Sequence, residues 1–245
     1  MTDQGHFVVV DAIDGAGKTT AFLAMAEWLR VKGHRLFDLV AFQKEHHRLP
    51  ELEEIGDADA LLSAEPTFCW TGSAIREEII RVNSGRTYSG RTAALAFSLD
   101  RHVLFSRVIL PFLRAKPERW VLQDRGVISS LAYQPLQDEQ VTLEWLQTLE
   151  GNALELSRPP ERLLLLRVTP DVALARITKR EATDEGRQIY ENASFQEKLA
   201  TRYRDPEVLA PYTKGGTIVV EIDAAQTPEQ VGLALTQELE KLVNA

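Results

Sequence analysis

The chain has 245 residues, 44% apolar and 26% charged, a composition typical of a globular protein with enough apolar side chains for one sizeable domain. Its net charge of −8 argues against broad, sequence-independent nucleic-acid binding, which needs a basic face. A single cysteine, Cys69, excludes an intramolecular disulfide, and no segment approaches the roughly 18 apolar residues of a membrane span, so we expect a cytoplasmic protein with small-molecule partners and no membrane or nucleic-acid partner.

Hydrophobic patterning predicts strands that alternate with helices. Residues 7–10 are a continuous apolar run, and the residues that follow a glycine-rich turn have apolar side chains at helical spacing. Further strands are predicted at 120–123, 162–168 and 217–222, and helices at 73–82, 92–113, 143–156, 171–179 and 228–242. Such alternation is typical of crossover units, so we expect an α/β domain with a mostly parallel sheet.

Residues 38–59 are polar and poorly patterned, and we interpret them as an insertion. It could cover a ligand cleft or bind another subunit. The neighbouring His46 and His47 could suggest a metal site, but adjacent side chains point in different directions and no third ligand is evident. We therefore expect them to be solvated loop histidines.

The segment VVVDAIDGAGKTT, residues 8–20, nearly matches the phosphate-binding pattern G-x-x-x-x-G-K-[ST], with Ala12 in place of the first glycine. Gly15 and Gly17 keep the freedom that lets backbone amides approach a phosphate, and alanine is tolerable at the exit of a strand if its φ is negative. Lys18 would reach the β- and γ-phosphate oxygens, and Thr19 would ligate Mg²⁺. The predicted nucleotide-binding residues are Asp14, Gly15, Ala16, Gly17, Lys18, Thr19 and Thr20.

The segment LQDRGVISSLAYQ places Asp124 and Arg125 at the end of a predicted strand. In open α/β folds this carboxyl edge of the sheet is where ligands bind. A carboxylate there can hold Mg²⁺ through water, and a guanidinium can bridge transferring phosphoryl oxygens. The alternative is a surface ion pair, which is common and weak.

Four segments, DGAGKTT, EPTFCWTGSAIR, FSLDR and DRGVISSLAYQ, together resemble the motifs of the thymidylate kinase family in order and spacing. The resemblance implies a three-layer P-loop fold with a mostly parallel five-stranded sheet, helices on both faces and a small lid at 180–190. It also implies one domain over residues 1–245, a homodimer, ATP and Mg²⁺ as cofactors, and phosphorylation of dTMP to dTDP.

The same resemblance assigns the substrate-binding residues. Asp14 would meet the deoxyribose 3′-hydroxyl, Arg76 and Arg125 the monophosphate, Phe97 the face of the base, Arg101 and Ser130 its edge, and Tyr133 the sugar, with Gln134 close by. Without the resemblance, Phe97 and Tyr133 could equally be core residues, and Arg76 a charge on a helix surface.

Two other functions stay open. A kinase of this fold could act on another deoxynucleotide or on a deoxynucleoside, because fold does not determine substrate. The arginine of the EPT…IR motif, Arg76, favours a substrate that is already phosphorylated. A non-catalytic nucleotide-binding switch is the third hypothesis, and it predicts loss of the substrate or lid residues, for which this sequence has candidates.

Ala16 is small and neutral at a position where some members of the family carry a basic residue, so we expect a lid to supply that charge. Arg180 and Arg187 follow the helix predicted at 171–179, in a polar, glycine-containing stretch. An arginine that contacts the transition state can contribute roughly 10³ to 10⁵ in rate. Arg180→Ala or Arg187→Ala should therefore lower turnover far more than it raises the KM for ATP, as steady-state kinetics would show. Turnover within a fewfold of wild type in both variants and in the double variant would exclude a lid arginine.

Overall fold

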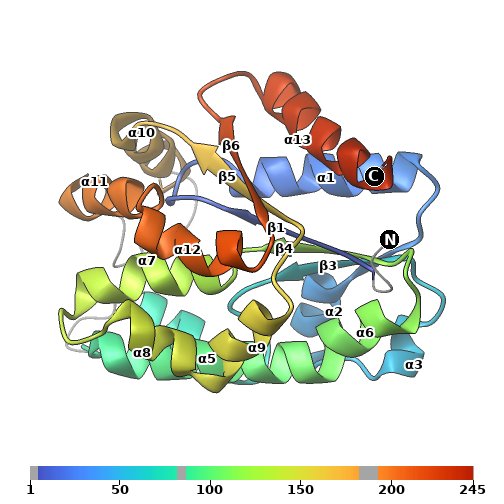
Figure 1. Ribbon diagram of the computed structural model, residues 1–245, viewed down its shortest axis with the longest axis horizontal. Helices are drawn as coiled ribbons and strands as arrows, with labels where there is room; N and C mark the ends of the chain where they lie inside the picture. Colours follow the sequence, from blue (N-terminus) through green and yellow to red (C-terminus); the bar gives the residue numbers. More distant parts are fainter. Residues whose placement is uncertain (1–4, 82–86, 182–192, 245) are drawn as a thin grey trace.

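The computed structural model describes residues 5–81, 87–181 and 193–244. Its centre is one sheet in which six strands pair in parallel, in the order β2-β3-β4-β1-β5-β6. The strands are β1 (His6–Asp11), β2 (Leu36–Asp38), β3 (Ala60–Ala64), β4 (Trp120–Asp124), β5 (Arg162–Arg167) and β6 (Ile218–Asp223). Parallel strands need crossover connections, and these place helices on both faces of the sheet (Figure 1). The expected three-layer α/β fold is confirmed, with six strands rather than five.

Helices α1 (Lys18–Val31) and α13 (Pro228–Val243) pack against each other on one face of the sheet, and α5 (Gly90–Leu104), α7 (Val127–Gln137) and α9 (Glu150–Ser157) pack together on the other (Figure 1). The remaining helices are α2 (Leu39–His46), α3 (Leu52–Ile55), α4 (Trp70–Ala74), the π-helical η1 (Ile75–Ile80) and η2 (Phe105–Ile109), α6 (Leu110–Ala115), α8 (Leu143–Thr148), α10 (Pro170–Glu181), α11 (Ala193–Arg202) and α12 (Pro206–Lys214).

The central strands are buried on both faces, which explains their continuous apolar sequences. Phe7, Val8, Val9 and Val10 of β1 are completely buried, because helices cover both sides of the sheet at this point. No helix among the described residues is both long and apolar enough to cross a membrane.

The segment 38–59, which we interpreted from the sequence as an insertion, contains α2 and α3 and forms the crossover between the parallel strands β2 and β3. Asp38 caps α2, because its side chain accepts the amide hydrogen of Ala41 at 2.9 Å. The sequence pattern missed β2 because a strand of three residues is too short to show a period. It also missed β3, although this strand has five residues like the predicted β4.

Other boundaries also differ from the predictions. The helix predicted at 92–113 is interrupted by the π-helical η2, and the one predicted at 143–156 is divided at Leu149 into α8 and α9. Helix α7 was not predicted. His46 lies in α2 and His47 ends it with a φ of 56°, and among the described residues no three His, Cys, Asp or Glu side chains gather as a metal site.

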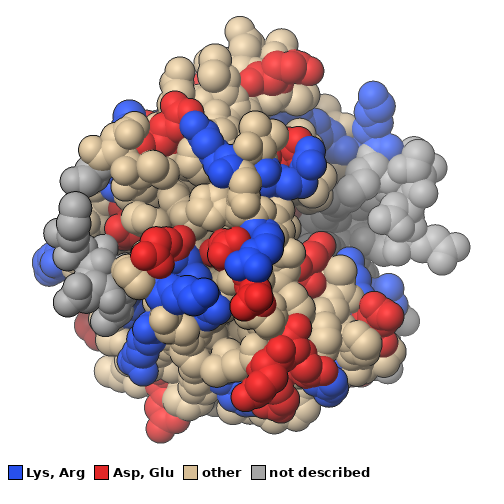
Figure 2. Space-filling view, turned by 90° about the vertical axis from the view of Figure 1, so that its right-hand side faces the viewer, with Lys and Arg blue, Asp and Glu red and all other residues tan. Residues whose placement is uncertain are grey.

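The surface at the right-hand side of Figure 1 carries lysines and arginines interspersed with aspartates and glutamates (Figure 2). Among the described residues on this side, the basic side chains form no extended area of their own.

Close packing of α9 on α5 depends on Gly151. A Cβ atom at this position would lie 1.9 Å from the carbonyl oxygen of Ser98, which belongs to the backbone of α5. Gly151→Ala should therefore force the two helices apart and lower the free energy of unfolding by about 1–3 kcal/mol in urea denaturation. Ala153→Ser, at an exposed position of α9, is the control and should change it by less than about 0.5 kcal/mol. Equal stability of Gly151→Ala and wild type would contradict this account of the interface.

Candidate active site

A tight loop joins the end of β1 at Asp11 to the start of α1 at Lys18, at the carboxyl edge of the sheet. Gly15 and Gly17 have φ values of 78° and 96°, in the left-handed region that favours glycine. A Cβ on Gly15 would also lie 2.3 Å from the carbonyl oxygen of Ala173 in α10. Among the described residues, positive φ outside glycine occurs at His47, Trp70 and Arg125 only. Ala12 therefore has the negative φ that allows an alanine in place of the first glycine of the pattern.

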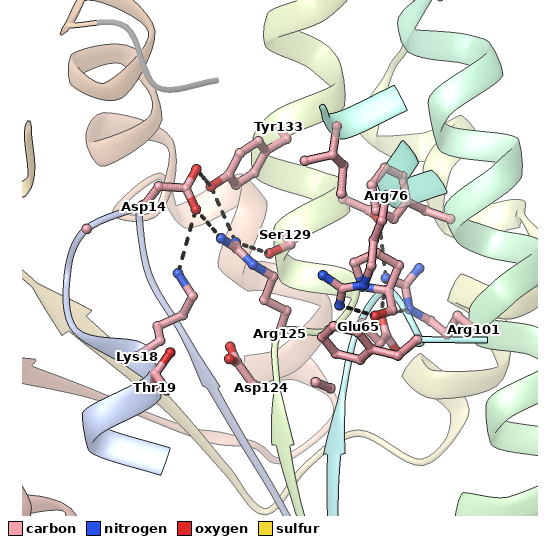
Figure 3. Close-up of a pocket in the computed structure, with 18 of the residues that line it drawn as sticks. Asp14, Lys18, Thr19, Glu65, Arg76, Arg101, Asp124, Arg125, Ser129 and Tyr133 are labelled. Carbon is pink, nitrogen blue, oxygen red and sulfur yellow. Dashed lines mark hydrogen bonds and ion pairs between the residues drawn. The ribbon is translucent and has the colours of Figure 1, made fainter. Parts of the chain in front are cut away.

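A cleft of about 460 Å³ opens above this loop (Figure 3). The predicted residues that line it are Asp14, Gly15, Gly17, Lys18, Thr19, Arg76, Phe97, Arg101, Asp124, Arg125, Ser130, Tyr133 and Gln134. Ala16 is buried within the loop and Thr20 belongs to α1, and neither lines the cleft. Residues from three separate strand ends, β1, β3 and β4, thus meet in one cavity.

Arg125 lies at the centre of the cleft and connects its two loops (Figure 3). Its guanidinium pairs with Asp14 and donates to the Ser129 hydroxyl at 3.1 Å and the Tyr133 hydroxyl at 3.3 Å. Tyr133 in turn donates to Asp14 at 3.0 Å. Burial by itself raises the pKa of Asp14, but the charges of Arg125 and Lys18 and the bond from Tyr133 hold it below its ordinary value. Asp14 is therefore a carboxylate at neutral pH.

The backbone of Arg125 is itself constrained. Its φ of 70° is uncommon for a residue with a side chain, and its amide donates to the carbonyl oxygen of Val10 at 2.9 Å. This bond ties the end of β4 to β1, so the guanidinium is held in the cleft by the sheet. The alternative considered from the sequence, a surface ion pair of Asp124 and Arg125, is therefore wrong.

Sequence reasoning did not select Asp11 as a site residue, although it anchors the loop. This completely buried carboxylate accepts hydrogen bonds from the Ser129 hydroxyl at 2.7 Å, the Tyr203 hydroxyl at 2.9 Å and the Ala12 amide at 2.8 Å. Tyr203 is 192 residues away in the chain, so no local pattern could have paired the two.

Lys18 points back over its own loop. Its Nζ donates to the carbonyl oxygens of Ala12 at 3.2 Å and Ile13 at 3.3 Å and lies 3.9 Å from Asp14. Burial, followed by the charge of Arg125, lowers the pKa of Lys18 against the opposing carboxylates. The ammonium is thus held at the entrance of the loop, where a phosphate would lie.

Thr19 and Asp124 both line the cleft (Figure 3). Asp124 Oδ1 is buried and has no hydrogen-bond partner within the described ranges, and burial raises the pKa of this carboxyl despite the nearby Lys18. A carboxylate and a hydroxyl that line the same cleft provide the oxygen donors that Mg²⁺ binds, often through its waters. These residues therefore fit a magnesium ion.

Arg101 is 1% exposed and forms part of the cleft wall. Its Nε donates to Glu65 at 2.8 Å and lies 3.3 Å from Glu155, and it also contacts Asn152. Its NH2 lies 3.4 Å from the Ser130 hydroxyl. Burial raises the pKa of Glu65 to about 8, although Arg101 opposes this shift.

Glu155 was not identified from the sequence. It is completely buried, and its two oxygens accept the Val127 amide at the start of α7 at 3.0 and 3.1 Å. Gly126 leaves the space that it needs, because a Cβ there would lie 2.8 Å from Glu155 Oε1. The glutamate therefore joins Arg101 to the helix that carries Ser130 and Tyr133.

Arg76 and Phe97 lie on the side of the cleft away from the loop. Arg76 donates to the carbonyl oxygens of Thr67, at 3.1 Å, and Pro66, so it is not the solvated helix charge that the sequence left open. Phe97 is half-buried, packs against a small apolar cluster that contains Ile75, and also lines the cleft. Phe97 is therefore partly a core residue and partly available to stack on a base, the two alternatives that the sequence left open.

Arg176 of α10 is a cleft residue that the sequence analysis passed over. It donates to the carbonyl oxygens of Ala16 at 3.2 Å and Ala224 at 3.0 Å, beside the phosphate loop. Arg176 precedes Arg180 by one helical turn, and this spacing could have identified it from the sequence as a second arginine on the same helix face. Arg187 and most of the lid at 180–190 lie outside the described residues, and the side chain of Arg180 is not described, so the lid mechanism stays a prediction.

A glycine-containing phosphate loop between a buried parallel strand and a helix, with arginines across one cleft, defines the class of P-loop phosphotransferases. Within that class, a sequence-family model described as Thymidylate kinase matches residues 49–232. The chain belongs to the thymidylate kinase family.

Individual relatives agree with this family over most of the chain. The thymidylate kinase of Halalkalibacterium halodurans is 32% identical, over 93% of this chain and 92% of its own. A thymidylate kinase of Prochlorococcus marinus is 26% identical, over 84% of this chain and 88% of its own. A probable thymidylate kinase of Thermococcus kodakarensis is 27% identical, over 95% and 98% respectively.

Lys18→Ala tests the phosphate loop. Lys18 provides charge at the loop rather than core packing, so its loss should lower turnover by roughly a thousandfold, because electrostatic stabilisation of the transition state is lost. The circular dichroism spectrum should be unchanged. Lys32→Ala, just beyond the end of the same helix, is the control and should keep full turnover. Near-normal turnover of Lys18→Ala would refute the assignment of this loop.

Proposed function

We propose that this protein transfers the γ-phosphoryl group of ATP to dTMP, giving ADP and dTDP. One observation carries the proposal: the phosphate loop and the arginines Arg76 and Arg125 line a single continuous cleft. A donor phosphate on the loop and an acceptor phosphate on the arginines would therefore meet inside it. Membership of the thymidylate kinase family supports dTMP as the acceptor.

On the donor side, the loop amides around Gly15 and Gly17 and the start of α1 would bind the phosphates of ATP. Lys18 would neutralise charge on the transferring group. Thr19 and Asp124 would hold Mg²⁺, which supplies further charge neutralisation when bound. Arg176, between Ala16 and Ala224, would close the outer end of this subsite.

On the acceptor side, Arg125 and Arg76 would orient the monophosphate, Asp14 and Tyr133 the sugar, and Phe97, Arg101, Ser130 and Gln134 the base. The acceptor phosphate is already an anion, so the residues need to position it rather than remove a proton. Catalysis would then depend on orientation and on the positive charge gathered at the loop.

A deoxynucleoside as acceptor would need a general base for its 5′-hydroxyl. Asp14 and Asp11, the acids of the loop, are engaged by Arg125 and Tyr133 and by Ser129 and Tyr203 respectively. This arrangement favours a monophosphate. A non-catalytic switch would not need the residues on the acceptor side of the cleft.

We further propose that the whole chain acts as one catalytic domain, with 180–190 as its lid, in a cytoplasmic homodimer. Leu95 and Leu99, one helical turn apart on α5, are about half exposed and would suit a surface covered by a second copy. Sedimentation analysis of the full chain tests the oligomeric state.

A coupled ADP-release assay on dTMP, UMP, other monophosphates and thymidine tests the function. Tyr133 is 6% exposed and bonded to Asp14, so it cannot easily move away from a ribose 2′-hydroxyl. We expect kcat/KM for dTMP to exceed that for UMP by at least about a hundredfold. Phe97→Ala should weaken the binding of all substrates, because stacking on the base is lost. Comparable use of UMP would contradict the sugar assignment, and nucleotide binding without turnover of any acceptor would favour the switch.

A further inference from the structure

The ring of Phe68, in the loop that follows β3, contacts two cations. The guanidinium carbon of Arg76 lies 3.6 Å from the ring centroid, and Nζ of Lys44 in α2 lies 4.3 Å from it. The backbone of Phe68 is also bound to α2, because its amide donates to Gln43 Oε1 at 2.8 Å. Gln43 is 1% exposed, so this bond is made inside the protein.

Arg76 takes its orientation from this loop. Its Nε and NH2 donate to the carbonyl oxygens of Thr67 and Pro66, and its flat face lies on Phe68. The loop is fixed on its other side by Asp100, which accepts the amide and the hydroxyl of Thr67, both at 2.7 Å. Any displacement of residues 66–68 would therefore move the guanidinium in the cleft.

We propose that Gln43, Lys44 and Phe68 are positioning residues that hold Arg76 toward the phosphate of the bound nucleoside monophosphate. Gln43 fixes the backbone, Phe68 covers the guanidinium, and the exposed Lys44 contributes least. Helix α2 belongs to the segment 38–59, so this segment is part of the acceptor site. The inference rests on the proposed function, because it assumes a monophosphate at Arg76.

Phe68→Leu and Gln43→Met test it in the full chain. Phe68→Leu removes the aromatic ring, and Gln43→Met removes the acceptor of the Phe68 amide while it keeps a side chain of similar size. We expect the KM for dTMP to rise about tenfold, as for a weakened charge-assisted hydrogen bond, with kcat changed less than about threefold and the KM for ATP unchanged. Thymidine has no phosphate, so its inhibition constant against dTMP should change less than about twofold. Phe68→Tyr, which keeps the ring, should restore the wild-type KM.

Phe42→Leu is the matched control. It is the same substitution on α2, and the residues that contact its ring are Phe37, His46 and Arg48. The control should leave the KM for dTMP unchanged, and circular dichroism should show all variants folded. In an Arg76→Ala background, Phe68→Leu should raise the KM no further, because its effect passes through the arginine.

An unchanged KM for dTMP in both variants would overturn the proposal, as would equal weakening of dTMP and thymidine, which indicates general damage to the pocket. Additive effects of Phe68→Leu and Arg76→Ala would also overturn it. Absence of wild-type turnover on dTMP would refute the proposed function instead. In that case calorimetric titration with dTMP and thymidine still tests the positioning of Arg76, because it needs no turnover.

Discussion

The ion pair of Arg125 with Asp14 joins the two loops that make the cleft, and much of the site depends on it. One loop follows β1 and carries the glycines, and the other follows β4 and leads into α7. A guanidinium largely removed from water is costly unless it is paired, and Asp14, Ser129 and Tyr133 pair with the half-buried Arg125. The same contacts keep Asp14 charged, so cation and anion stabilise each other where a phosphate acceptor would lie.

A second buried network supports the opposite wall. Arg101 lies between Glu65 of the loop after β3 and Glu155 of α9, and Glu155 also binds the start of α7. Losing one member of such a network leaves an uncompensated charge, typically at a cost of about 3–5 kcal/mol. The wall is therefore rigid, and the loop that carries Phe68 is fixed at one end by this network and at the other by α2. Rigidity suits a reaction that depends mainly on positioning two phosphates.

The missing first glycine of the phosphate loop has a simple physical explanation. Glycine is needed where φ is positive or where another backbone approaches, and both conditions hold at Gly15 but not at Ala12. Ala12 has a negative φ and is buried at the end of β1, where a methyl group adds apolar contact. The phosphate-binding sequence pattern is therefore incomplete, whereas the loop has the backbone conformation that the pattern requires.

The sequence by itself determined the α/β class, the phosphate loop and most of the cleft residues, because these depend on local patterns: apolar runs in buried strands, glycines at a turn, and motifs at fixed spacing. It did not reveal β2, which is too short to show a period, and it also missed β3 and the contact of α2 with Phe68. The partners Asp11–Tyr203 and Arg101–Glu155 are 192 and 54 positions apart. Only the tertiary structure decided which charges are buried together, because a long-range ion pair has no signature in either of its local sequences.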